Sequence, residues 1–302
     1  MALKVPAKGV ALVAVLWLLA LLSLMAAALT TTSRLEGQLT LNQDQTVRGQ
    51  ALAEGAIRLA MVNLLQPATQ QPWLADGGIQ QISLNQQQVE LAISDERGKV
   101  DINNATPELL TQLLLAAGAD EQEVQLVDVI LDWRDGDDLV SLHGAEDADY
   151  AAAGLDYGAK DAPFQSLDEL DLLLGMPAAL AQRLKPALTV MTHASTVNPL
   201  YAPPLVLLAL AGGDQTLVDN YVQERRRSHQ QHVTPPVFPL DSPLLAKGSS
   251  TGLYYSISAQ SWVDDQRPYA MTVLVKRQGR FPDMPFDILS QGRTPPWPGG
   301  GS

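Results

Sequence analysis

Acidic side chains crowd one short stretch of the chain, where their spacing could bind a cation. Seven carboxylates fall within the eighteen residues from 132 to 149. If they converge, their negative charges repel one another, and a cation would relieve that repulsion. Oxygen ligands from a flexible loop suit Ca²⁺, which accepts about six to eight of them at ~2.3–2.6 Å. The preferred ligands are Asp135, Asp137, Glu146, Asp147 and Asp149, with Asp132 in reserve.

Two other interpretations of this acidic loop stay open. The loop could be a solvated surface without a ligand, or two of its acids could form the acid pair of a hydrolase. The register of an EF-hand, D-x-D-x-D-G, is missing. The sequence also lacks a G-x-S-x-G elbow, a glycine-rich phosphate loop and an H-E-x-x-H motif. We therefore predict a protein that is not an enzyme, with a membrane-anchored periplasmic hydrolase as the alternative.

A predicted helix at residues 124–131 leads into the acidic loop, and the surrounding sequence is helical as well. Two octapeptides, Val100–Pro107 and Val197–Pro204, align without gaps, and an apolar helical run follows each of them. Proline is tolerated in the first turn of a helix because its missing N–H has no helical partner there. We predict an inserted all-α domain at residues 104–243 that holds the acidic loop.

Charge and composition limit the partners of the chain. The net charge is −13, which argues against a phosphate-binding surface, so no nucleic acid partner is expected. The basic run at residues 224–227 predicts the solvated end of a helix, and a docking site for an acidic partner is the alternative. No cysteine is present, which excludes a disulfide framework and a thiolate metal site.

Two segments on either side of the helical domain alternate like strands. Val89, Leu91 and Ile93 alternate with polar residues, and residues 95–98 supply a turn before Val100 and Ile102, which predicts a hairpin. A weaker strand precedes it near residues 79–84. A second hairpin is predicted from residues 255–259 and 269–275, with a turn at residues 264–267. Together, residues 67–103 and 244–278 predict a small antiparallel sheet.

Proline, glycine and polar residues dominate the end of the chain, from residue 279 to residue 302. Such a composition buries too little apolar surface to fold independently. We predict a flexible tail.

The N-terminal stretch supplies the element on which the sheet would pack. Lys4 and Lys8 precede Gly9, and the next twenty residues, 10–29, are uncharged and apolar. At about 1.5 Å per residue they form a helix of roughly 30 Å, which can span a bilayer. Basic residues on the short side place the N-terminus in the cytoplasm and the body outside it. Helical periodicity continues to residue 66, before Pro67, which predicts one helix over residues 10–66 and a leader over residues 1–9.

The leader and first helix resemble those of type IV pilin-like proteins, in which a membrane peptidase cleaves after this glycine. The resemblance implies processing after Gly9 and a mature chain that starts at Val10. Most pilin-like proteins carry a glutamate where this chain has Ala14. In this missing acid, and in the D-W-x-D-x-D and G-A-E segments of the acidic loop, the chain resembles K-type minor pseudopilins. These form the GspK family of the type II, or general, secretion pathway.

This resemblance implies an α+β fold: a long N-terminal transmembrane helix packed on a small antiparallel, pilin-like sheet, with a large inserted all-α domain. It implies a non-enzymatic component of type II protein secretion at the tip of a periplasmic pseudopilus, where it initiates or caps assembly. The implied partners are the I- and J-type minor pseudopilins, the prepilin peptidase and the inner membrane of a Gram-negative bacterium. The outer-membrane secretin and secreted substrates are further candidates. The resemblance also implies structural Ca²⁺ in the helical domain.

Overall fold

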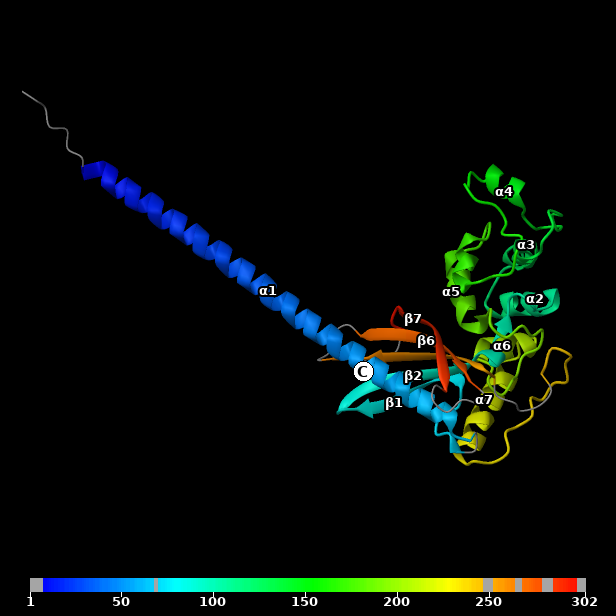
Figure 1. Cartoon of the computed structure of the whole chain (residues 1–302). Coiled ribbons are helices and arrows are strands. Elements are labelled where there is room, and N and C mark those ends of the chain that lie inside the picture. Colours follow the sequence, from blue (N-terminus) through cyan, green and yellow to red (C-terminus); the bar gives the residue numbers. More distant parts are fainter. Residues whose placement is uncertain (1–7, 68–69, 247–251, 264–267, 279–284, 298–302) are drawn as a thin grey trace, which may run out of the picture.

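The computed structural model describes residues 8–67, 70–246, 252–263, 268–278 and 285–297. Within the first helix, side chains are described for residues 12–25 and from residue 43 onward. The chain forms an antiparallel sheet against the second half of a long helix, and several shorter helices extend from one end of the sheet (Figure 1). The predicted α+β class is confirmed.

A single helix, α1 (Lys8–Leu65), occupies the first part of the chain. Its 58 residues extend over roughly 87 Å at about 1.5 Å per residue. No proline interrupts it, and Pro67 follows its last turn. Its first half projects away from the rest of the molecule (Figure 1). Over the residues that the structure describes, no helix combines the length and the apolar character needed to cross a membrane. Within the predicted span, residues 10–29, side chains are described only for residues 12–25.

Five strands form the main sheet, in the order β1-β2-β5-β6-β7, and every neighbouring pair is antiparallel. Their bounds are β1 (Asp76–Leu84), β2 (Gln87–Asp95), β5 (Tyr254–Ser261), β6 (Tyr269–Arg277) and β7 (Phe286–Arg293). Strand β2 pairs directly with β5, although the helical insert separates them in the sequence. Strands that precede and follow the insert in the sequence therefore form one continuous sheet.

One face of the sheet packs on the second half of α1. Alternate apolar residues of β2, β5 and β6 are fully buried against small residues of the helix, such as Ala53, Ala56 and Ala60. Gly49 marks the closest approach, because a Cβ added there would lie 2.9 Å from Cβ of Tyr269. Small helix residues therefore allow the sheet and the helix to pack in direct contact.

The predicted hairpin between residues 89–93 and 100–102 is wrong. Residues Glu96–Gly98 form a 3₁₀ turn, and Val100–Asp101 (β3) leaves the sheet to pair in parallel with Leu188–Thr189 (β4). The hairpin partner of β2 is β1, the strand that the sequence indicated only weakly. Asn85 and Gln86 have φ values of 49° and 68°, and left-handed residues of this kind suit a two-residue hairpin turn.

The prediction of a flexible tail is also wrong for part of residues 279–302. Strand β7 pairs with most of β6, from Arg277 and Phe286 at one end to Met271 and Arg293 at the other. Most of its side chains are exposed, so backbone hydrogen bonds with β6 hold it in place. Such a strand has no apolar alternation for the sequence to reveal.

Beyond β7, Trp297 ties the chain to the sheet face opposite α1. Its indole Nε1 donates to Oε2 of buried Glu90 at 2.7 Å, and its backbone N donates to Oε1 of buried Gln260 at 3.0 Å. Glu90 and Gln260 are register partners in β2 and β5. The tail therefore crosses the seam where the two halves of the sheet meet.

We predict that Trp297→Ala loosens this seam. Losing the indole hydrogen bond to the carboxylate of Glu90 costs about 1.5–3 kcal/mol, so amides of residues 87–95 and 254–261 should exchange faster with deuterium in the variant. A chain that ends after residue 297 keeps both contacts and serves as the control. Unchanged exchange in Trp297→Ala would mean that the indole of Trp297 contributes nothing to the sheet.

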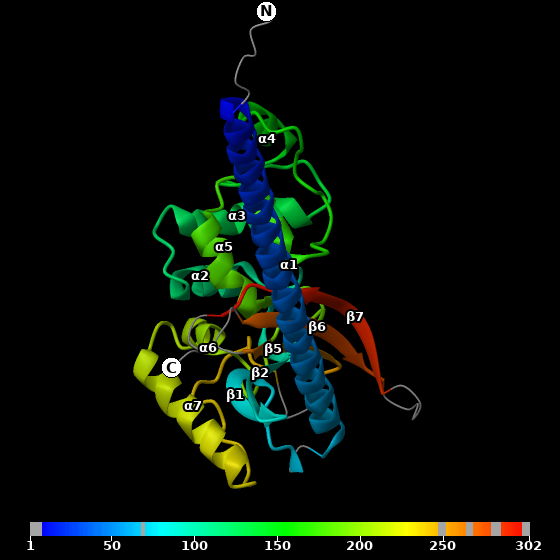
Figure 2. The same cartoon turned by 90° about the vertical axis from the view of Figure 1, so that its left-hand side faces the viewer.

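The residues between β2 and β5 form a separate helical unit with its own core. The unit contains α2 (Pro107–Ala116), α3 (Leu126–Arg134), α4 (Asp147–Ala152), α5 (Ala178–Leu184), α6 (Pro204–Leu210) and α7 (Gln215–Gln230). Short 3₁₀ turns lie at Glu123–Gln125, Leu167–Leu172 and Lys185–Ala187. Helices α6 and α7 lie nearest the sheet and α4 lies farthest from it (Figures 1 and 2). The region is predominantly helical, and the two-residue strand β4 lies within it.

The octapeptide repeat has a structural counterpart. Pro107 and Pro204 are the first residues of α2 and α6, as predicted. Arg134 on α3 donates to the carbonyls of Ile102 and Ala105. At the aligned positions of the second copy, Arg225 on α7 donates to the carbonyls of Pro199 and Ala202, both at 2.9 Å. Each copy therefore pairs its octapeptide with an arginine from a following helix.

Arg225 also corrects the prediction that residues 224–227 are solvated. Its side chain is 0% exposed, and Nη2 lies 2.7 Å from Oδ2 of Asp76, which is 2% exposed. Burial lowers the pKa of Arg225, and the Asp76 carboxylate opposes that shift. The buried pair joins the helical insert to strand β1.

Candidate functional site in the acidic loop

The acidic loop connects α3 to α4 at the end of the helical insert that lies away from the sheet (Figure 1). The last turn of α3 supplies Asp132, and the residues after Arg134 leave the helix. Trp133, which follows Asp132, is buried in the core of the insert, and this burial fixes the end of α3. The first carboxylate of the loop is therefore held by the core.

Asp132 is fully buried, and only half of its carboxylate is satisfied. Oδ2 accepts from the backbone N of Ser141 at 3.0 Å, while Oδ1 has no hydrogen-bond partner. Gly144 lies against the same group, because an added Cβ would come within 1.7 Å of Oδ2. The glycine of the G-A-E segment is thus required by the packing of Asp132.

Glu146 is the second buried carboxylate. It is 5% exposed, and Oε1 has no hydrogen-bond partner. Burial, followed by repulsion from Asp132 and Asp161, raises the pKa of Glu146 to about 7. Asp132 Oδ1 and Glu146 Oε1 are therefore buried oxygens without a hydrogen-bond partner among the residues that the structure describes.

Asp135, Asp138 and Asp161 also influence Glu146, and Asp161 was missed from the sequence. Burial and repulsion from Asp137 and Asp132 raise the pKa of Asp135. Asp161, which has a φ of 52°, lies near enough to Asp147 that their repulsion, after burial, raises its pKa. Asp161 follows the acidic stretch by twelve residues, and no local pattern linked it to the loop.

The remaining predicted ligands lie at the edge of the site. Asp137 is exposed, and its Oδ1 accepts from Leu139 N at 3.0 Å. Oδ2 of Asp149 accepts from Glu146 N at 3.0 Å and caps α4. Asp147 is exposed and packs on Gly158, where an added Cβ would lie 1.7 Å from Oδ1. The predicted processing site, Gly9 and Val10, lies outside the residues whose side-chain environment is described.

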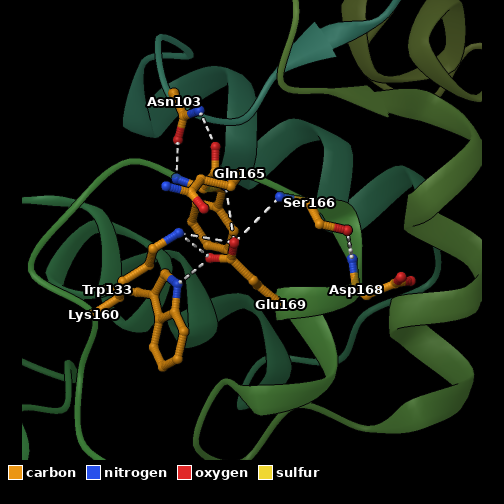
Figure 3. A network of polar contacts seen from close by, with 8 residues as sticks. Asn103, Trp133, Lys160, Gln165, Ser166, Asp168 and Glu169 are labelled. Atoms are coloured by element: carbon orange, nitrogen blue, oxygen red, sulfur yellow. Dashed lines mark hydrogen bonds and ion pairs between the residues drawn. The ribbon is translucent and has the colours of Figure 1, made fainter. Parts of the chain in front are cut away.

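A polar network holds the segment that carries Asp161 (Figure 3). Glu169 accepts from Trp133 Nε1 at 3.1 Å, from Lys160 Nζ at 2.8 Å and from Gln165 N at 2.9 Å. Burial alone would raise the pKa of Glu169, but these hydrogen bonds lower the pKa overall. The Asn103 side chain fixes Phe164 through hydrogen bonds of 2.7 and 2.9 Å. The loop that returns Asp161 to the acids is therefore anchored on both sides of that residue.

The donor chemistry of this site suits Ca²⁺, since every candidate ligand is an oxygen and two buried oxygens lack partners. In the described parts of the chain, no group of three or more histidine, aspartate or glutamate side chains is arranged so that it could already hold a metal ion. The exposed acids would have to move toward Asp132 and Glu146 to complete a shell. The cavities of about 370, 650 and 350 Å³ are lined by none of these acids.

Similar proteins identify the family. A family model described as type II secretion system (T2SS), protein K, matches residues 82–193, which contain the whole acidic loop. Type II secretion system protein K of Klebsiella pneumoniae is 30% identical over 313 residues, covering 95% of this chain and 94% of that protein. The chain belongs to the type II secretion system protein K family. The protein K of Aeromonas hydrophila is 38% identical over 98 residues, or 30% of each chain.

Membership in the protein K family makes the chain a minor pseudopilin of the type II secretion system, a structural component of protein secretion. The resemblance noted in the sequence is confirmed. A solved structure, the GspK-GspI-GspJ complex of enterotoxigenic Escherichia coli, matches 88% of this chain and 99% of its own, with a TM-score of 0.55 and 20% identity. This likeness supports the fold.

Proposed function

We propose that this protein K caps the tip of the periplasmic pseudopilus and initiates its assembly. The observation that carries the proposal is a single 58-residue helix whose sheet bears a large helical insert at one end. A thin fibre of laterally packed helices has little room for such an insert along its shaft. The end of the fibre has room for it. Ala14 supports a position at the end of the fibre, because it offers no carboxylate to the amino terminus of a neighbouring subunit.

Cross-linking within secreting cells tests the position. Cysteines placed on α1 should give adducts with other pseudopilins and few adducts between two copies of this chain. If adducts between copies dominate and recur along purified fibres, the protein is a shaft subunit and the tip proposal fails.

The first half of α1 supports membrane anchoring. Its described residues, 12–25, are all exposed, and they include the large apolar side chains Leu12, Leu16, Trp17, Leu24 and Met25. Apolar surface of this extent requires lipid or protein cover. We propose that residues 10–29 hold the protein in the inner membrane, with its body in the periplasm.

We further propose that the prepilin peptidase removes residues 1–9. A bulky side chain at Gly9 would obstruct the peptidase near the scissile bond, so Gly9→Trp should leave the precursor uncleaved. Intact-protein mass spectrometry decides the matter, with Ala2→Trp, which is remote from the proposed bond, as the control. A mature chain that begins anywhere other than Val10, or normal processing of Gly9→Trp, would refute the assignment.

The proposed partners are the I- and J-type minor pseudopilins, the subunits named with GspK in the matched complex. The second half of α1 offers a surface for them, because its outward side exposes Val47, Leu59, Val62 and Leu65 by 64%, 41%, 54% and 44%. These side chains do not pack on the sheet of the same chain. The outer-membrane secretin and secreted proteins are the further partners that such a tip would meet.

We also propose that the acidic loop holds structural Ca²⁺. Asp132 and Glu146 would supply the two unpartnered buried oxygens, and Asp135, Asp137, Asp147 and Asp149 would complete the shell as the loop closes. Asp161 joins the candidates because its carboxylate responds to Asp147. The ion would neutralise the charges that repel one another and so order the loop.

The calcium proposal predicts a melting temperature that depends on the cation. A ligand at a hundred times its dissociation constant adds about 2.7 kcal/mol to the free energy of unfolding, which should raise the melting temperature by several degrees. Magnesium should replace calcium poorly, because it demands a smaller octahedral shell. Glu146→Ala and Asp137→Ala should reduce the response. Equal melting in calcium, magnesium and chelator would show that the loop is only a solvated surface.

The raised pKa of Glu146 gives the hydrolase alternative its one specific support, since a carboxyl near pKa 7 can act as a general acid. The family assignment favours the structural role. Turnover of a substrate by the purified protein, lost in Glu146→Gln, would restore the hydrolase.

A further inference from the structure

The connection between α3 and α4 exposes apolar side chains that the acidic site does not use. Leu139, Val140 and Leu142 are 76%, 55% and 89% exposed. They follow one another in a segment without helix or strand, at the end of the insert away from the sheet (Figure 1). Large apolar groups gathered on an exposed segment indicate a surface that a partner covers.

The backbone of this segment is held in place while its apolar side chains face outward. Three alternate amides donate to carboxylates: Leu139 N to Asp137 Oδ1, Ser141 N to Asp132 Oδ2 and His143 N to Asp128 Oδ2, each at 3.0 Å. Gly144 N adds a bond of 3.1 Å to the carbonyl of Ser141. A segment fixed in this way loses little conformational freedom on binding, which favours affinity.

The surrounding charge selects the kind of partner. From residue 135 to residue 159 the sequence holds acids but no lysine or arginine. The exposed acids nearest the apolar side chains are Asp137 and Asp138. Anionic lipid surfaces attract basic segments, and this segment is acidic, so a membrane is disfavoured. A second copy of the chain would bring identical acids face to face, which is disfavoured for the same reason.

We propose that residues 138–142 dock into an apolar groove on a partner protein, with cationic side chains at the rim of the groove. The leucines would enter the groove, and exposed Asp138 beside them, which is not a proposed calcium ligand, would face the rim. The proposal stands on exposure, backbone order and charge, so it does not depend on the proposed tip position. It assigns a contact surface to the distal end of the insert, far from the exposed side of α1.

The test begins with a photo-cross-linking residue in the full-length protein. Placed at Leu142 in secreting cells, it should give one adduct of defined mass, and the cross-linked partner is then identified by mass spectrometry and purified. The purified partner is titrated against the full-length chain. Leu139→Ser together with Leu142→Ser should weaken binding on the order of a hundredfold, and binding should weaken further as salt rises.

Val237→Ser is the matched control, since Val237 is also 89% exposed but lies on the connection between α7 and β5. It should bind the partner like the parent. Because both serine variants alter exposed side chains, their melting temperatures should match that of the parent. No adduct at Leu142, an adduct only with lipid or with another copy, a partner site without cationic residues, or equal binding by the double variant would each overturn the proposal.

Discussion

Replacing Arg225 with methionine should destabilise the protein by about 3–5 kcal/mol, the usual cost of removing one partner of a buried ion pair. The change removes the closest cationic partner of Asp76, which is 2% exposed, and leaves only the longer contact of 3.6 Å to half-exposed Arg226. It also removes the donor to the carbonyls of Pro199 and Ala202. With a urea m-value of ~1–3 kcal/mol per molar, the unfolding midpoint should fall by roughly 1 M or more.

Arg226 provides a matched control for this prediction. Its Nε lies 3.6 Å from the same Asp76 oxygen, but its side chain is 51% exposed. An exposed pair contributes about 0–1 kcal/mol, so Arg226→Met should be nearly neutral. Combining Arg225→Met with Asp76→Asn should recover part of the loss, because the uncompensated charge is gone. Equal effects of the two arginine substitutions would contradict a stabilising buried ion pair between the insert and the sheet.

Replacing Trp133 with alanine should cost a similar amount, about 3–5 kcal/mol. The indole is 3% exposed and packs on Tyr150 and Phe164 with ring centroids 5.9 and 6.2 Å away. Its Nε1 also donates to Glu169. Because Trp133 follows Asp132 directly, the cavity left behind should loosen the end of α3 and the acidic loop together.

Hydrogen–deuterium exchange distinguishes this local effect from a uniform loss of stability. In Trp133→Ala, amides of residues 126–166 should exchange faster, whereas those of β5 and β6 should change little. Trp133→Phe keeps an aromatic ring at this position but loses the indole hydrogen bond and part of the ring volume, so its cost should be intermediate. Uniform acceleration across the insert and the sheet would show that Trp133 does not act locally.

The elements that the sequence predicted correctly carry their signal within a few residues. Strand β2 alternates because Val89, Leu91 and Ile93 all face α1, and strands β5 and β6 alternate for the same reason. The starts of α2 and α6 were predicted because a proline at the first position of a helix is a local mark. The position of Asp132 beside the acidic loop follows from the end of a short amphipathic helix.

The elements that the sequence missed depend on distant partners. Strand β7 is ordered by the edge of β6 and has no buried face of its own. Val100 has the apolar character of a sheet residue, but its pairing partner is Leu188, in another part of the insert. Arg225 lies in a basic run, and it is buried only because it forms an ion pair with Asp76, 149 residues earlier. Asp161 reaches the acidic site through a left-handed turn and the Glu169 network.

The exposed side of α1 allows the assembly proposal to be tested separately from folding. Val62 is 54% exposed and does not contact the sheet core, so Val62→Asp should leave the melting temperature unchanged while it disrupts contact with another subunit. Ala60 is fully buried against the sheet, and Ala60→Asp should unfold the body instead. The two variants separate loss of assembly from loss of structure.

The most direct measurement is size-exclusion chromatography with light scattering on the full-length chain in detergent, mixed with purified I- and J-type minor pseudopilins. We expect one complex of defined stoichiometry with the parent chain and none with Val62→Asp. A parent chain that elutes alone at micromolar concentrations in the presence of both subunits would contradict its role as a minor pseudopilin that assembles with them.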